Sequence, residues 1–214
     1  LALAAVAPVS AGATFFGPSG YISMPTTDAL SMGQVEVFAN YVSLDNTNEA
    51  PIGVNVGLGF GFEVGATQIH QSEGDSDEAI INAKYVFGGN LVMPKIAIGA
   101  TNIADNEHFL GSFVRPRTGE ANPYIVMGKS LNLPAGTAVS VNAGYMAGSV
   151  DKGMFGASVN LSPKIQLMAD YIGDFSKLSV GARYNTGSGL GLQAASIDGE
   201  FAVGIMYTKA LWGN

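Results

Sequence analysis

Cysteine is absent from the 214 residues, charged residues make up only 13%, and no long apolar run occurs. A chain without cysteine suits passage through an oxidising periplasm, where stray thiols would be oxidised. No stretch of about 18 or more apolar residues is present, which argues against a membrane-spanning helix. The net charge of −7, with Lys and Arg scattered rather than clustered, argues against nucleic acid as a partner.

Residues for catalysis or cofactor binding are also scarce. The only histidines are His70 and His108, and a hydrolase would need a serine such as Ser72 held against one of them. No glycine loop precedes a helix, so no phosphate site is expected. The sequence therefore predicts a protein that is not an enzyme and that has no cofactor and no dedicated metal site.

What the sequence does have is strict alternation of apolar and polar residues. Between Asp151 and Leu211 five runs of about ten residues follow one another with two to five turn residues between them. In Phe155–Leu161 every second residue is apolar, and those between are small or polar; Met168 is the exception in the next run. Because side chains alternate across a strand, these runs predict consecutive antiparallel hairpins.

Alternation alone allows the apolar face to point into a soluble core or out into lipid. Two features favour lipid: tyrosines recur at the ends of the apolar rows, as an aromatic girdle does, and the other face carries glycines and full charges in mid-strand. The charges expected to face the lumen are Glu36, Glu63, Lys84, Lys129, Asp170 and Arg183. The girdle residues expected at the two rims are Tyr41, Phe60, Tyr85, Tyr145, Tyr171, Tyr184 and Tyr207.

Projecting this period over the chain predicts an all-β, antiparallel, up-and-down transmembrane β-barrel of about 12 strands over residues 34–214. The expected strands are 34–43, 51–60, 61–70, 79–88, 94–103, 121–130, 137–147, 152–162, 164–172, 176–186, 189–196 and 200–210. Strand 121–130 fits either register, and the one that points Lys129 inward, with Tyr124 and Val126 outward, is preferred.

The connections fall into two sets, short turns and longer loops, as in a bacterial barrel with short periplasmic turns. Thirteen of the 17 acidic residues lie in or beside the longer set, and none lies in the short turns. We therefore expect loops 44–50, 71–78 and 104–120 to face outside. The acidic run Glu73–Glu78 lacks the order of an EF-hand and is read as a solvated loop, which could also bridge to lipopolysaccharide through divalent cations.

The lumen of such a barrel is wider than that of an eight-stranded one and narrower than that of large porins. Its charges could pair with one another as a structural network or form a charged constriction. Inward-facing glycines leave space for water or for a plug.

The N-terminal part departs from the alternation. Residues 1–13 have the apolar stretch and the Ala11-Gly12-Ala13 ending of a signal-peptide remnant. Residues 14–33 are broken by glycine and proline and predict a plug or a periplasmic segment, or else a thirteenth strand.

Within this part, Gly17, Gly20, Tyr21, Ile22, Met24, Pro25, Thr26 and Thr27, followed by Gly33 and a strand, form a G-x-x-G-hydrophobic-x-x-P-T segment. In this segment the chain resembles the YjbH-type family of outer-membrane barrels associated with exopolysaccharide export. The resemblance implies a β-barrel and a part in polysaccharide export.

These observations predict a bacterial outer-membrane barrel that acts as a pore or as a component of envelope export. The alternatives are a non-conducting structural or interaction barrel, and a soluble extracellular β-barrel. The expected partners are outer-membrane lipid, lipopolysaccharide with divalent cations, and a second copy or another envelope protein.

Overall fold

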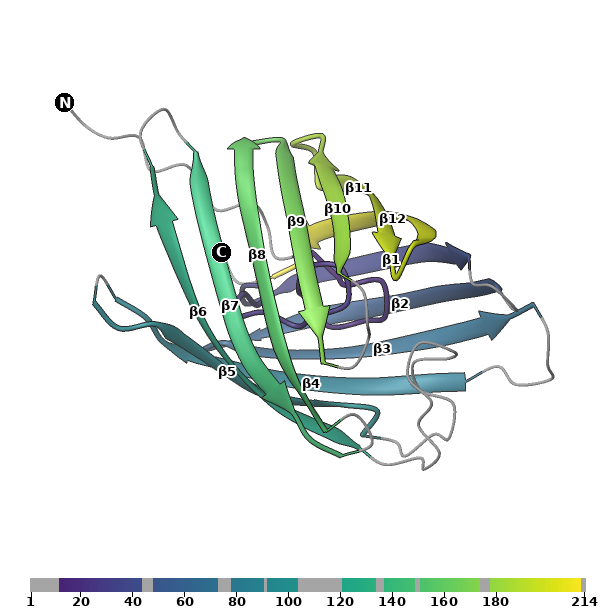
Figure 1. Ribbon diagram of the computed structural model, residues 1–214, viewed down its shortest axis with the longest axis horizontal. Helices are drawn as coiled ribbons and strands as arrows, with labels where there is room; N and C mark the ends of the chain where they lie inside the picture. The colour runs from purple at the N-terminus through teal and green to yellow at the C-terminus, as the bar shows by residue number, and fades with distance from the viewer. Residues whose placement is uncertain are drawn as a thin grey trace.

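The described part of the chain forms one closed antiparallel β-barrel of twelve strands in a computed structural model (Figure 1). The structure describes residues 12–43, 48–72, 78–90, 92–103, 121–133, 137–148, 151–173 and 178–212. The strands are β1 (Gln34–Ser43), β2 (Asn48–Gly59), β3 (Phe62–Gln71), β4 (Glu78–Gly88), β5 (Lys95–Thr101), β6 (Asn122–Asn132), β7 (Ala138–Met146), β8 (Lys152–Ser162), β9 (Ile165–Ile172), β10 (Ser179–Asn185), β11 (Leu190–Ile197) and β12 (Glu200–Ala210).

Each strand pairs with the next one along the chain, and β1 closes the ring against β12, for example with Val37 opposite Tyr207. The predicted fold class and the strand count are thereby confirmed. The alternating period fixes the type of element, and a closed ring leaves no strand edge unpaired. The described residues contain no helix long and apolar enough to cross a membrane.

The barrel has two different ends. The β2–β3, β4–β5, β6–β7, β8–β9 and β10–β11 connections lie at one end, which we call the short-turn end. The other connections, which include the long one between β5 and β6, lie at the opposite end, the loop end. At the β2–β3 turn, Phe60 stands between Gly59 and Gly61, and all three have positive φ. Glycine adopts such angles without steric penalty, so this sequence favours a tight turn at that point.

Strand ends differ from the expected ones by up to three residues. β2 begins at Asn48, three residues earlier than expected, because the chain continues to pair with β1 and β3 there. Glu49, expected in an outer loop, is therefore a buried strand residue whose Oε1 lies 3.4 Å from the side-chain nitrogen of Gln71. The remaining parts of the expected outer loops at 44–47, 73–77 and 104–120, and residues 1–11 of the expected signal remnant, lie outside the described residues.

The outward face of the barrel is apolar. Exposed Val, Ile, Leu, Phe and Tyr side chains alternate with buried residues along the strands. Six of the seven residues expected in the girdle are exposed, with Phe60 at 92%, while Tyr85 is half-buried because its ring stacks between Phe62 and Phe87.

The expected register of strand 121–130 is wrong. In β6, Tyr124 and Val126 are 5% and 0% exposed and point inward, whereas Ile125 and Met127 are 49% and 54% exposed. The inward pair packs in an apolar cluster of the barrel interior. Lys129 consequently lies in the outward row, opposite Val141. The ammonium of Lys129 has a hydrogen-bond partner there, because the side chain reaches the short-turn end and donates a hydrogen bond of 2.7 Å to the carbonyl of Asn90.

Candidate functional site

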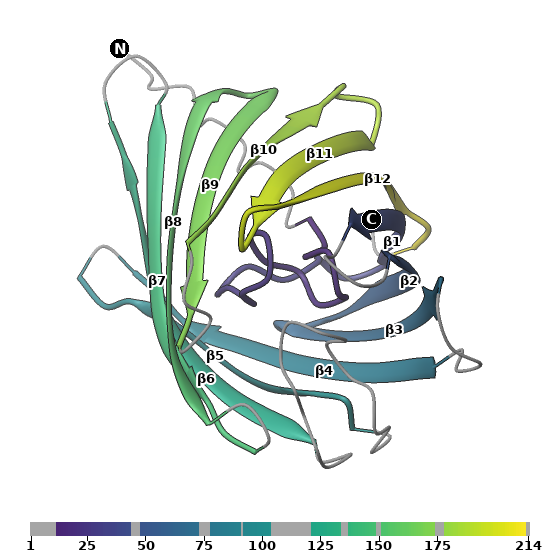
Figure 2. The same ribbon diagram turned by 45° about the vertical axis from the view of Figure 1, so that its right-hand side comes forward.

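The barrel interior holds the chain's own N-terminal part. Residues 12–33, which we call the inner segment, form the dark purple coil enclosed by the strands in Figure 2. Its apolar side chains Phe15, Phe16, Ile22, Met24 and Leu30 are all buried. The segment has little regular structure beyond two isolated bridges, Ala13 with Ser19 and Gly20 with Pro25. Five of its backbone N–H groups bond to carbonyls of the segment itself. Many of its other backbone groups bind wall side chains, because a buried polar group needs a partner.

Glu36 of β1 and Arg183 of β10 hold the start of the segment from two sides. The carboxylate of Glu36 accepts a 2.7 Å hydrogen bond from the backbone N–H of Ala13, and Arg183 donates one of 2.9 Å to the Ala13 carbonyl. Arg183 also donates to the carbonyls of Gly20 and Tyr21. Both wall side chains are buried, so these charge-assisted bonds act in a medium of low dielectric.

Glu63 of β3 and Lys84 of β4 form an ion pair, with 3.5 Å between the charged atoms, that binds the middle of the segment. Glu63 accepts hydrogen bonds from the backbone N–H and the hydroxyl of Ser19, at 3.0 and 2.7 Å, and from the N–H of Leu30 at 2.9 Å. Lys84 donates to the carbonyls of Ser19 and Asp28, at 2.8 and 2.6 Å. The pair thus binds two stretches of the segment at once.

Asp170 of β9 binds the turn of the segment. One oxygen, Oδ2, accepts hydrogen bonds from three consecutive backbone N–H groups, those of Ile22, Ser23 and Met24, at 2.9, 2.8 and 2.9 Å. Three donors converging on one carboxyl oxygen satisfy three buried N–H groups and fix the turn in place.

Wall amides satisfy further carbonyls. Asn40 donates 2.9 Å to the Phe15 carbonyl, and Asn55 donates 2.7 Å to the Gly17 carbonyl. Asn142 accepts from the backbone and hydroxyl of Thr27 and donates 2.7 Å to the hydroxyl of Tyr21. Burial raises the pKa of Tyr21 to about 12, so its hydroxyl stays protonated and donates to the Ser140 carbonyl.

Towards the loop end the segment is covered by apolar packing. Phe15, Phe16, Tyr21 and Ile22 form one buried cluster with wall residues Val42, Ile69, Ile80, Met168, Ala195, Ile197 and Ala202. Met168, the apolar exception in a polar row, faces inward because it packs against this cluster. The interior is thus polar around the charged wall side chains that bind the segment, and apolar where the aromatic side chains of the segment lie.

Wall glycines lie where the segment comes closest. A Cβ built on Gly156 would stand 2.6 Å from the ring of Tyr21, one on Gly128 would stand 2.3 Å from the hydroxyl of Thr27, and one on Gly57 would stand 2.1 Å from the Ser31 carbonyl. Larger residues at these places would collide with the segment.

Five of the six expected lumen charges, all except Lys129, therefore meet around the inner segment. Their alternation with apolar residues made them visible in the sequence. Sequence reasoning did not foresee that their main partners are backbone groups. Nor does the sequence indicate that Asn40, Asn55 and Asn142 bind the segment, since nothing in an isolated Asn signals which backbone group it binds.

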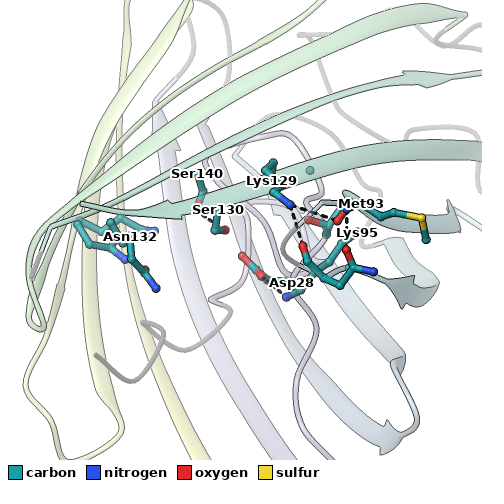
Figure 3. A pocket seen from close by; sticks show the side chains of 14 residues that line it. Asp28, Met93, Lys95, Lys129, Ser130, Asn132 and Ser140 are labelled. Atoms are coloured by element: carbon teal, nitrogen blue, oxygen red, sulfur yellow. Dashed lines mark hydrogen bonds and ion pairs between the residues drawn. The ribbon is translucent and has the colours of Figure 1, made fainter. Parts of the chain in front are cut away.

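A polar cavity of about 380 Å³ opens beside the segment at the short-turn end (Figure 3). Asp28, Lys95, Ser130 and Ser140 line it, and Lys95 lies 3.4 Å from the carboxylate of Asp28. A second cavity of about 400 Å³, lined by Leu30, Met32, Phe60 and Phe87 among others, lies on the other side of the same stretch.

Features of a catalytic or metal centre are few in the part of the chain that the structure describes. No three His, Asp or Glu side chains gather there as metal ligands. The hydroxyl of Ser72 accepts a hydrogen bond of 2.9 Å from the backbone N–H of Asn48.

The closed ring, the apolar outer face and the polar interior define a barrel of the outer-membrane porin type in fold. The structure is similar to one titled KdgM porin, with a TM-score of 0.54 and 12% identity over 81% of this chain and 98% of that chain. It is also similar to the outer membrane protein Omp33 of Acinetobacter baumannii, with a TM-score of 0.52 and 9% identity over 83% of this chain and 98% of that one. At these identities the likeness is one of fold. No family model and no curated protein matches the sequence, so nothing supports the YjbH-type family in particular.

Proposed function

We propose that the chain is a bacterial outer-membrane pore whose lumen is closed by its inner segment, which acts as a plug. The observation that carries the proposal is the filling of the barrel by residues 12–33, tied to Glu36, Glu63, Lys84, Asp170 and Arg183. A wall built only for rigidity could pair these charges with one another. Here Glu63 and Lys84 do pair, but all five charges also bind a segment that is not part of the wall. Release of that segment would leave a polar, charged lumen.

The membrane location is supported by the continuous apolar outer face. Tyr41, Tyr145 and Tyr171 lie on it towards the loop end, and Tyr184 and Tyr207 towards the short-turn end. Apolar side chains between two aromatic rims suit a bilayer, with the loop end outside and the short-turn end in the periplasm. A soluble protein would rarely expose so large an apolar surface. No enzymatic step is part of the proposal.

A part in polysaccharide export is a second candidate. The residues that resemble the YjbH-type segment, from Gly17 to Thr27, are those that Glu63, Asp170, Arg183 and Asn142 hold inside the barrel. In an export system, the same segment would have to leave before a chain of sugars could pass.

The test is conductance in planar bilayers. Asp170→Leu removes the acceptor of three backbone N–H groups, so the variant should open more often than the wild type, in steps of larger conductance. Lys95→Gln is the matched control, because its ion pair with Asp28 is exposed and contributes little.

Equal traces for the wild type and Asp170→Leu would contradict closure by the inner segment. The unboiled protein should also migrate differently from the boiled one on a gel, as closed membrane barrels do. Identical migration would count against a membrane barrel altogether.

A further inference from the structure

The wall recognises the inner segment through its main chain. In the stretch from Gly12 to Gly33, Asp28 is the only charged residue. Glu36, Asp170 and Arg183 bind backbone N–H or C=O groups of the segment, as do the amides of Asn40 and Asn55. The interior thus offers what a bound peptide needs: buried acceptors for N–H groups and buried donors for C=O groups.

Two glycines of the segment determine which peptide sequences can fit this interior. Gly17 has φ of +141°, and a Cβ on it would stand 2.5 Å from the amide nitrogen of Asn82 and 2.7 Å from the hydroxyl of Thr67. A Cβ on Gly20 would stand 2.2 Å from the carbonyl of Met24 across the turn. A peptide that fits this interior therefore needs glycine at both ends of a Gly-x-x-Gly stretch.

The segment enters and leaves the barrel at the same end. Ala13 is held by Glu36, two residues after β1 begins, and by Arg183, two residues before β10 ends, and both positions lie near the short-turn end. Gly33 leads directly into β1 at that end. The segment is thus an inserted loop rather than a threaded strand, and it can withdraw without any strand separating.

The surroundings favour departure in that direction. The apolar cluster around Phe15 and Ile22 covers the segment towards the loop end, whereas the two cavities flank residues 27–32 at the short-turn end. Solvent already reaches the stretch that joins the segment to β1, since Ser31 and Met32 are exposed.

From this geometry we propose that the barrel interior is an exchangeable peptide-binding site. Its ligand is a polypeptide segment with the Gly-x-x-Gly stretch of residues 17–20, bound through its main chain, and the segment of a second copy of this chain can take the place of the first. The inference rests on the proposed closure of the barrel, but its test measures peptide binding and not conductance, so the two can fail separately.

The experiment uses the whole chain and cuts it by protease at one place, just before β1. A protease recognition sequence is inserted between Ser31 and Met32, the protein is folded into detergent micelles, and the chain is then cut. A fluorescent peptide of residues 12–31 should bind the cut barrel saturably as the old segment leaves. The uncut protein should bind little of it, because its tethered segment competes at a local concentration on the order of millimolar.

Unlabelled competitors test the recognition. The Gly17→Ala peptide should compete about tenfold less well than the wild-type peptide, since overpacking a close contact typically weakens affinity by a factor of this order. The Asp28→Asn peptide should compete almost as well as the wild type, because the ion pair it loses is exposed. Failure of the labelled peptide to bind the cut barrel would overturn the proposal, as would equal competition by the Gly17→Ala peptide.

Discussion

Glu63 and Lys84 face each other across β3 and β4 with 3.5 Å between their charged atoms, and both bind Ser19 of the inner segment. Both side chains are buried. Either charge left alone would be far from water, so each depends on the other and on the segment between them.

We expect Glu63→Gln to destabilise the folded barrel more than the double variant Glu63→Gln/Lys84→Gln does. Removing one member of a buried ion pair costs about 3–5 kcal/mol because the other charge stays buried without its partner, whereas removing both leaves no such charge. Urea unfolding in lipid vesicles, followed by gel migration of unheated samples, measures the difference.

The control for this pair is Asp28→Asn, which breaks the exposed ion pair with Lys95 and should change stability by less than about 1 kcal/mol. If the double variant were as unstable as the sum of the two single ones, Glu63 and Lys84 would act independently.

Gly156→Ala should displace Tyr21 and weaken the hold on the inner segment. The added Cβ would stand 2.6 Å from the Tyr21 ring, whose hydroxyl bonds with Asn142 and Ser140 would then be lost. Such overpacking typically costs about 1–3 kcal/mol. The midpoint of urea unfolding should fall and bilayer conductance should rise.

Gly153→Ala, on the same strand, is the matched control, because a Cβ there would meet nothing within 4 Å. A loss of stability as large in Gly153→Ala as in Gly156→Ala would mean that alanine disturbs β8 itself, not its contact with the segment.

The barrel could be predicted from the sequence because the pattern that produces it lies within each strand and the turn that follows. Alternation with a period of two fixes strands, glycine-rich turns separate them, and an even number of antiparallel strands is typical of a closed bacterial barrel. The same alternation separated Glu36 and Asp170 from the apolar residues beside them, and the structure buries both.

The partners of those charges could not be read in this way. The inner segment has no periodicity, so nothing local says that Asp170 would meet the N–H groups of Ile22 to Met24, almost 150 positions away. The register of β6 failed for a related reason. Tyr124 and Val126 face inward because they pack against a cluster that contains Met24, a contact that only the folded chain creates.

Ile205→Arg should impair insertion into a bilayer. Ile205 is exposed on the outward face of β12, opposite Ala39 in the middle of β1. An arginine near the bilayer midplane of a barrel costs about 2–4 kcal/mol, but only about 0–1 near the interface. Leu211→Arg, just beyond the end of β12, is therefore the control. Folding yield into lipid vesicles measures both, and equal yields for the two variants would favour the soluble alternative.

Single cysteines can test the register of β6 cleanly, because the chain has none of its own. A fluorophore on Ile125→Cys should be quenched by brominated lipid tails, since Ile125 points outward in the structure, opposite Ile98. One on Ile98→Cys should behave in the same way. Val126→Cys should be shielded from the quencher, because Val126 is buried beside the inner segment's Met24. Quenching of Val126→Cys with Ile125→Cys unaffected would restore the register that points Lys129 into the lumen, and would remove the wall against which Met24 packs.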